Sequence, residues 1–418
     1  MFLLAAILAV PGLACHDALE VELPGRIPTD LLNDPTTAPT LAASVTADFE
    51  CAFANYVVVT SMIGDDFLGA SGNLNAKNWG TRKIYEDDTA NEQNTCNDQQ
   101  GFGAYTPLQT ARFQSDDILK RLNGWTDEQA KTSLAPLRAK VAVLGAYTYT
   151  LLGEGFCAMR LDNEKSIKTP AEVLAIAKSK FDAALLLVNE MPNGAAKTEL
   201  LNLLYVGRAR TLLDLNDKAG AAADAALVAP GFEFFVTRSV DATTRFNKAF
   251  YRLTEQGHSS VDPAYRTLTV GGEPDPRVQV AFGPDKGFPK TAFDGVTPLY
   301  VVTNKNTTRA DPMRLASYIE AQLILAEALG GTEAVAIINA RRDQLNLPDY
   351  SGPTDEASVT ALILDERNRE FFMEGGQRYN DLLRYSIPWK VGNDQNGVPY
   401  GTTTCMPLPI SEKIAAGG

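Results

Sequence analysis

The chain has 418 residues, of which 45% are hydrophobic and 21% are charged, and its formal net charge is −13 with a pI near 4.8. This length and composition are those of a folded protein that can bury a large core. The acidic balance and the absence of any run of Lys and Arg argue against a nucleic-acid-binding protein, because phosphate binding requires a concentrated basic surface.

The N-terminus has the pattern of an export signal. An apolar run at residues 3–10 leads into Gly12, Ala14 and Cys15. The run is far shorter than the ~20 apolar residues of a membrane-spanning helix, and it is typical of a signal peptide that ends in small residues. We predict that residues 1–15 are a signal peptide ending at a lipidated Cys15. Residues 16–40 contain four prolines, which predicts an extended tether between the anchor and the folded part.

The other cysteines predict disulfides. They are Cys51, Cys96, Cys157 and Cys405, an even number, which in an exported protein favours paired cysteines. Four cysteines allow three pairings, and the sequence does not choose among them. We expect Cys51 to pair with Cys96, because both flank one N-terminal loop region, which leaves Cys157 for Cys405. With no CxxC pair and only two histidines, we predict no metal site and no cofactor.

Helical patterns begin at about residue 41. Residues 105–122 and 134–152 carry apolar side chains at steps of three and four, and capping boxes at Thr126 and Thr169 mark helix starts. Three helical hairpins are predicted between residues 134 and 228. In the last of them, small residues and a proline lie at nearly the offsets of a tetratricopeptide repeat, namely Gly207, Ala219, Ala226 and Pro230.

The helical pattern is lost in residues 236–310, where glycines and prolines separate short polar segments. An irregular region of this length inside a folded protein usually carries function. His258 lies in this region, and we expect it to be a solvated loop residue, not a catalytic base.

From residue 311 the sequence becomes specific. Helical patterns at residues 311–328 and 334–342 precede a dense charged motif within residues 363–384. The motif consists of Glu366, Arg367, Glu370, Phe371, Glu374, Gly375, Arg378, Asp381, Leu382 and Arg384. This series, followed by Pro407 to Ile410, closely resembles the C-terminal half of SusD/RagB proteins, and looser similarity extends over most of residues 41–418.

The resemblance implies a mainly α fold, namely a SusD-like α-helical bundle with tetratricopeptide-like hairpins and a long irregular loop region. Residues 41–235 would form the N-terminal helical part, residues 236–310 the loop-rich ligand side, and residues 311–418 the C-terminal helical part of one integrated fold. SusD/RagB proteins are surface-exposed lipoproteins of the outer membrane. They capture oligosaccharides, or in some branches peptides, and deliver them to a SusC-like TonB-dependent transporter without catalysing a reaction.

In this family the ligand contacts come from the N-terminal region and from the long loop before the C-terminal helices. Sugar recognition combines aromatic faces, which stack on C–H surfaces, with polar side chains that bond hydroxyl groups. Residues of these types are Asp66, Trp79, Arg82 and Tyr85, with Tyr300 as a second-rank candidate. Trp79 and Tyr85 could equally be packing residues under a long loop, and both interpretations stay open.

The charged motif has two interpretations. On a helix, Glu366 and Glu370 share one otherwise apolar stripe, and two neighbouring carboxylates are what a glycoside hydrolase uses. Both would point the same way, however, with no open face for a sugar ring. We therefore interpret the motif as a structural charge network in which arginines neutralise buried acids. Its predicted members are Glu366, Arg367, Glu370, Glu374, Arg378 and Asp381, with Arg341 and Arg342 as further cations.

These observations predict a non-enzymatic, lipid-anchored protein of the outer membrane that binds oligosaccharides. The alternatives are a RagB-like peptide-binding protein, a tetratricopeptide-type scaffold for protein partners, and a glycoside hydrolase.

Overall fold

The computed structural model describes residues 31–93, 95–96, 102–162 and 164–417. The predicted signal peptide, Cys15 and the tether up to residue 30 lie outside the described residues. The end of the predicted tether is not extended. Residues 31–33 and 35–37 form short 3₁₀ helices, and the first long helix begins at Ala38. This part is helical because Ala38 and Leu41 are buried against Leu122 and Leu134 in a small apolar cluster, and burial outweighs the extended preference of a Pro-rich segment.

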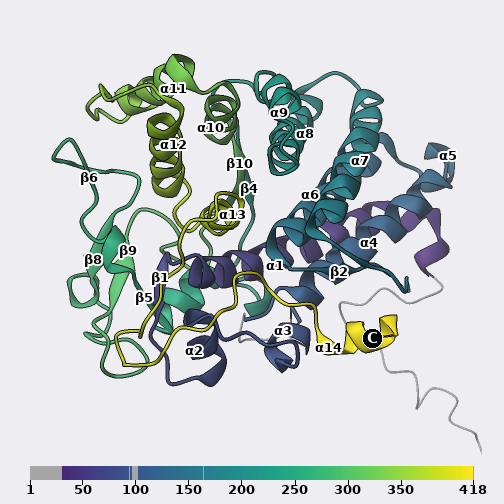
Figure 1. Cartoon of the computed structure of the whole chain (residues 1–418). Helices are drawn as coiled ribbons and strands as arrows, with labels where there is room; N and C mark the ends of the chain where they lie inside the picture. Colours follow the sequence, from purple (N-terminus) through teal and green to yellow (C-terminus); the bar gives the residue numbers. More distant parts are fainter. Residues whose placement is uncertain (1–30, 94, 97–101, 163, 418) are drawn as a thin grey trace, which may run out of the picture.

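The fold is mainly helical (Figure 1). The helices are α1 (Ala38–Ile63), α2 (Leu74–Gly80), α3 (Thr89–Gln93), α4 (Tyr105–Asn123), α5 (Asp127–Ala130), α6 (Ala135–Gly155), α7 (Pro170–Asn189), α8 (Ala195–Asp214), α9 (Lys218–Ala225), α10 (Tyr318–Leu329), α11 (Gly331–Gln344), α12 (Glu356–Glu370), α13 (Gln377–Arg384) and α14 (Ile410–Ala416). The capping boxes predicted at Thr126 and Thr169 are both present, at the starts of α5 and α7.

Helices α6 to α9 form the repeat-like half of the molecule, at the right of Figure 1. Gly207 lets α8 approach its neighbours, because a Cβ atom there would lie 2.5 Å from ring atoms of both Phe181 on α7 and Tyr147 on α6. The Tyr147 hydroxyl donates a hydrogen bond to the Leu203 carbonyl of α8. The glycine picked out by the repeat pattern is therefore a packing residue of the helical stack.

The strands are short, and β5 to β9 lie within the loop-rich region. They are β1 (Phe67–Gly69), β2 (Met159–Arg160), β3 (Ile167–Lys168), β4 (Glu233–Val236), β5 (Ser259–Val261), β6 (Thr269–Val270), β7 (Glu273–Pro274), β8 (Val280–Phe282), β9 (Tyr300–Val302) and β10 (Met313–Ser317). They pair antiparallel as β1–β5, β4–β10, β2–β3, β6–β7 and β8–β9. Two of these pairs join segments far apart in the chain: β1–β5 fastens the loop-rich region to the N-terminal helical part, and β4–β10 joins the segments on either side of it.

One main core underlies these elements. Helix α1 crosses the centre of the molecule (Figure 1) and is buried along most of its length. The core also contains residues of all three predicted segments, such as Phe53, Val261 and Tyr379. A separate apolar cluster holds α10, α11 and α12 together.

Two disulfides are present, with the expected pairing: Cys51 with Cys96, and Cys157 with Cys405. The second holds the C-terminal segment against the end of α6. Beyond α13 this segment runs back past α2 to α14, as the yellow trace in Figure 1 shows. Along the way the Gly401 amide donates a hydrogen bond to the Thr81 carbonyl, and the Ile410 amide donates one to the Glu86 carbonyl. The end of the described chain therefore lies against its N-terminal region.

Candidate functional site

The structure separates the five predicted ligand residues. Trp79 is fully buried in the main core and Asp66 is 3% exposed. A ligand cannot reach either side chain from the surface, so their predicted ligand contacts are wrong for this conformation. Trp79 is buried because α2 packs closely on β1, where Gly69 and Gly80 approach each other. Tyr85 is 57% exposed, and its neighbour Glu86 forms an ion pair with Lys413 of α14.

Asp66 lies beneath the surface as a structural residue. Its Oδ2 accepts a hydrogen bond of 3.2 Å from the Met373 amide, and burial raises the pKa of the carboxyl to about 7. Arg378, which was expected to neutralise the glutamates of the charged motif, favours the ionised form of this carboxyl and of Asp65. Among the described residues no ion pair joins Arg378 to Glu366, Glu370 or Glu374.

The other two predicted residues belong to one region built by loops. Arg82 is 3% exposed, so its predicted ligand contact is wrong on the same ground, whereas Tyr300 is half-buried. We define the loop site as Asp65, Arg82, Asp262, Arg266, Tyr300, Trp389, Lys390 and Tyr400. These residues come from the ends of α1, α2 and β5, from β9, and from the C-terminal segment.

Arg82 lies at one end of the loop site, between two aromatic rings. Its guanidinium carbon is 5.3 Å from the ring centroid of Trp389 and 5.4 Å from that of Tyr400. The same guanidinium donates a hydrogen bond to the Lys390 carbonyl. Both rings are half-buried, so part of each is open to solvent. Cation–π contacts of this kind hold an arginine and its rings in fixed positions.

Lys390 links this end of the loop site to its centre. Its ammonium group lies 3.7 Å from Asp65 Oδ1 and forms a close ion pair with Asp262. Burial raises the pKa of Asp65, and Lys390 and Arg82 oppose that effect. Burial also lowers the pKa of Arg82. These partly buried charges are therefore held by one another, with little help from water.

Tyr300 lies at the other end. The Arg266 guanidinium carbon is 4.0 Å from the Tyr300 ring centroid, and Arg266 Nε donates a hydrogen bond of 2.9 Å to the Val261 carbonyl. Arg266 is also an electrostatic neighbour of Asp262. Arg82 and Tyr300 are thus joined through a continuous series of ion pairs and ring contacts.

The backbone of the loop site takes conformations that side chains rarely favour. Asp65 and Arg82 have φ values of 64° and 54°, and such left-handed residues cluster at functional sites. The C-terminal segment approaches so closely that a Cβ on Gly401 would lie 2.2 Å from the Arg82 carbonyl oxygen, which requires glycine there.

Sequence reasoning missed six of the eight residues. Trp389 packs against the main core, is half-buried and contacts Arg82. Asp65 directly precedes the predicted residue Asp66, whereas Asp262, Arg266, Lys390 and Tyr400 carry no motif. The one usable signal was the concentration of aromatic and charged residues at 389–400.

The charged motif forms the predicted structural network, with additional members. Glu366, which is 1% exposed, is bound by Arg342 of α11 and by Arg277 of the loop-rich region. Arg341 binds Glu370 through two hydrogen bonds of 3.0 and 3.1 Å. Arg367 pairs with Asp381 at 2.8 Å.

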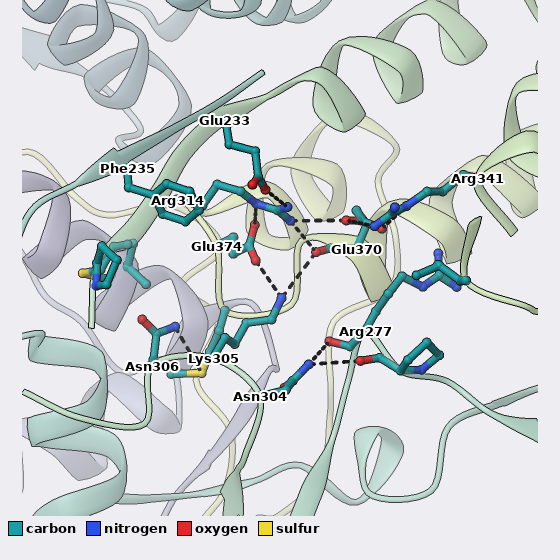
Figure 2. A pocket seen from close by; sticks show the side chains of 16 residues that line it. Glu233, Phe235, Arg277, Asn304, Lys305, Asn306, Arg314, Arg341, Glu370 and Glu374 are labelled. Atoms are coloured by element: carbon teal, nitrogen blue, oxygen red, sulfur yellow. Dashed lines mark hydrogen bonds and ion pairs between the residues drawn. The ribbon is translucent and has the colours of Figure 1, made fainter. Parts of the chain in front are cut away.

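Figure 2 shows the solvent-facing side of this network, where Arg314 contacts Glu233, Glu370 and Glu374, and Lys305 contacts Glu374. Burial favours the neutral form of Glu370, but Arg341 and Arg314 outweigh burial and lower its pKa. Glu370 therefore stays ionised, and both Glu366 and Glu370 are held in fixed ion pairs, which does not suit a general acid.

His258 is buried, contrary to expectation. Its Nδ1 lies 2.8 Å from Ser71 Oγ, and its ring packs 4.8 Å from that of Phe293. Burial, together with Arg252, lowers the pKa of the imidazole to about 4. Among the described residues, no cluster of His, Cys, Asp and Glu could hold a metal ion. Over the same part of the chain, no helix is long and apolar enough to cross a membrane.

Comparison with known proteins found a family match and many structural matches. The sequence model described as SusD family matches residues 286–405. No match was found among curated proteins.

The similar structures have the same fold over almost the whole chain. A SusD superfamily protein from Bacteroides vulgatus is 15% identical with a TM-score of 0.65, covering 92% of this chain and 97% of that one. Surface glycan-binding protein A from Bacteroides thetaiotaomicron is 15% identical with a TM-score of 0.66, covering 91% of this chain and 97% of that one. The same protein in complex with laminarihexaose is 15% identical with a TM-score of 0.62, covering 90% and 98%.

Proposed function

We propose, from the SusD family match over residues 286–405 and the shared fold, that the chain is a SusD/RagB family member: a surface protein that binds oligosaccharides and delivers them to a SusC-like TonB-dependent transporter. The proposal places ligand binding at the loop site. Glycan binding is supported by the fold shared with a protein that has been crystallised with laminarihexaose. The transporter partner follows from the family resemblance.

The loop site carries the proposal because it combines the two kinds of group that sugars require. Trp389, Tyr400 and Tyr300 offer partly exposed rings for C–H surfaces, while Asp65 and Lys390 are half-buried polar groups beside them. Their mutual contacts fix their positions before a ligand arrives. Such preorganisation reduces the conformational entropy lost on binding.

No catalytic role is part of the proposal. Glu366 and Glu370 are each bound by two arginines, so neither carboxylate is available to attack or protonate a glycosidic bond. The absence of hydrolysis products after long incubation with every bound oligosaccharide would support this view, and turnover abolished by Glu370→Gln would contradict it.

The binding proposal is tested by measuring the binding of the mature protein to an array of oligosaccharides and peptides. The variants are Trp389→Ala and Tyr400→Ala, with Tyr85→Ala testing the remaining exposed candidate. Phe113→Ala is the matched control, since this aromatic residue of α4 is 55% exposed and lies outside the loop site. Melting temperatures confirm that each variant is folded.

Binding to a glycan class that is weakened by Trp389→Ala and Tyr400→Ala, but not by Phe113→Ala, would support the proposal. Binding to peptides alone would replace it with the peptide-binding alternative. If glycan binding is the same in all loop-site variants, the glycan-binding site is not the loop site.

Surface anchoring is a separate part of the proposal and rests on Cys15. Cells that express the protein would be labelled with a fatty-acid probe, with Cys15→Ala as the comparison. Labelling lost in the variant supports lipidation, and equal labelling of both proteins excludes Cys15 as the acylated residue.

A further inference from the structure

A cavity lies away from the loop site, beside the charge network (Figure 2). Its volume is about 290 Å³, at the small end of the range for ligand pockets. Its walls come from β4, β10, residues 304–306, the end of α11 and the end of α12. Because these segments are far apart in the chain, the cavity exists only in the folded protein.

One wall is a paired platform of an aromatic ring and a guanidinium group. Phe235 of β4 is the register partner of Arg314 of β10, so the two side chains lie on the same face of this short sheet. Phe235 is 40% exposed. It therefore offers an apolar surface to the cavity beside a group that is already fixed by three carboxylates.

The charges of the cavity wall are balanced. Each lining cation has a carboxylate partner. The pairs are Arg277 with Asp275 and Glu366, Lys305 with Glu374, Arg314 with Glu233, Glu370 and Glu374, and Arg341 with Glu370. A charged ligand would have to separate one of these pairs and leave a partly buried charge without its partner, which is costly.

A neutral ligand with hydroxyl groups has no such cost. The Glu233 side chain is 50% exposed and touches Arg314 at only 3.3 Å, so its carboxylate keeps capacity to accept hydrogen bonds. Glu374 and Lys305 are 12% and 19% exposed, and lie at the surface of the network. These groups can bond hydroxyls without leaving their ion pairs.

We propose that this cavity is a second carbohydrate site that takes one or two neutral sugar units, with Phe235 as the stacking surface and Glu233 as a hydroxyl acceptor. The inference rests on the proposed function, because it assumes that the protein meets oligosaccharides. It adds a site separate from the loop site and selective against charged sugars.

The test measures binding of D-glucose, D-galactose, D-mannose and N-acetyl-D-glucosamine by saturation-transfer NMR titration. D-glucuronate and D-glucosamine serve as charged comparators. The variants are Phe235→Ala and Glu233→Gln, which change exposed side chains. Trp389→Ala perturbs the loop site alone, and Phe113→Ala is the control for loss of an exposed ring.

At least one neutral sugar should bind, with affinity roughly three- to tenfold weaker in Phe235→Ala and also weaker in Glu233→Gln. In the Trp389→Ala and Phe113→Ala proteins, the part of the neutral-sugar binding that depends on Phe235 should remain. The charged sugars should bind more weakly than the neutral ones. If no sugar of the panel depends on Phe235, or if charged sugars bind equally well, the inference is overturned. If oligosaccharide binding still depends on Trp389 in that case, the proposed function stands although this inference fails. If no oligosaccharide binding depends on Trp389 while a neutral sugar binds at Phe235, only the proposed function is refuted.

Discussion

The pairing of Glu366 with Arg342 gives a quantitative prediction for Glu366→Ala. Arg342 Nε and Nη2 both donate to Glu366 Oε1, at 2.8 and 2.6 Å, and the Arg342 side chain is 8% exposed. After the substitution Arg342 keeps only a 3.2 Å hydrogen bond to the Pro348 carbonyl. Arg277 also loses Glu366, but keeps Asp275. The main cost is therefore one buried guanidinium without a counter-charge.

Breaking a buried ion pair by removing one partner costs about 3–5 kcal/mol. We expect Glu366→Ala to lower the free energy of unfolding by about this amount, measured by urea denaturation with the disulfides intact. Glu199→Ala is the control, because Glu199 is an exposed acid on α8, and it should change stability by less than about 0.5 kcal/mol.

A double-mutant cycle with Arg342→Ala isolates the pair. The double variant should be less destabilised than the sum of the single variants, because removing both partners leaves no uncompensated charge at this position. A loss below about 1 kcal/mol for Glu366→Ala, or strictly additive effects in the cycle, would show that the charge is not buried as described.

Three further predictions concern other buried groups. Because burial raises the pKa of Asp66 to about 7, the folded state holds a proton that the unfolded state loses above its ordinary pKa of 3.8; stability from this group is lost as the pH rises toward 7. Unfolding of Asp66→Asn at pH 5 and pH 8 should therefore show the variant gaining on the wild type at the higher pH, by up to about 3 kcal/mol, and a pH-independent difference would contradict this. The pKa of His258 is lowered to about 4, so stability should fall as the pH drops from 6.5 toward 4, because the unfolded state binds the proton first; His258→Gln should flatten that slope in denaturation series across this range, and an unchanged slope would exclude His258 as its source. Cys157→Ser combined with Cys405→Ser should cost about 2–5 kcal/mol in thermal or urea unfolding, and an unchanged midpoint would mean that the C-terminal segment is held by its other contacts alone.

Features encoded over a few residues were predictable from the sequence. The capping boxes at Thr126 and Thr169 are local, because the hydroxyl and the acceptor three residues later meet within one helical turn. The repeat pattern around Gly207 was also predictable, since stacked helices need a small residue where they approach most closely. The pairing of Arg341 and Arg342 with the motif glutamates was predictable because these residues lie on two consecutive helices, α11 and α12.

Features that depend on the relative orientation of distant segments were not predictable. Trp79 and Tyr85 are six residues apart and chemically similar, yet one is buried and the other exposed, because only one faces β1. Arg277, Lys305 and Arg314 join the charge network from loops and from the short strand β10, segments too short for a sequence period to fix the direction of a side chain. The loop site combines residues from 65 to 400, so its composition is visible only after folding.

The return of the C-terminal segment across α2 has a consequence for biogenesis. Trp389, Lys390 and Tyr400 provide one side of the loop site, and their partners Asp65 and Arg82 are made more than 300 residues earlier. In a nascent chain the loop site is incomplete until residue 400 has been added and has crossed to its distant partners, a long-range closure that is slow compared with local helix formation. Premature termination or C-terminal clipping before residue 389 would therefore yield a protein that keeps its repeat helices but lacks one side of the loop site, and with it the binding proposed there.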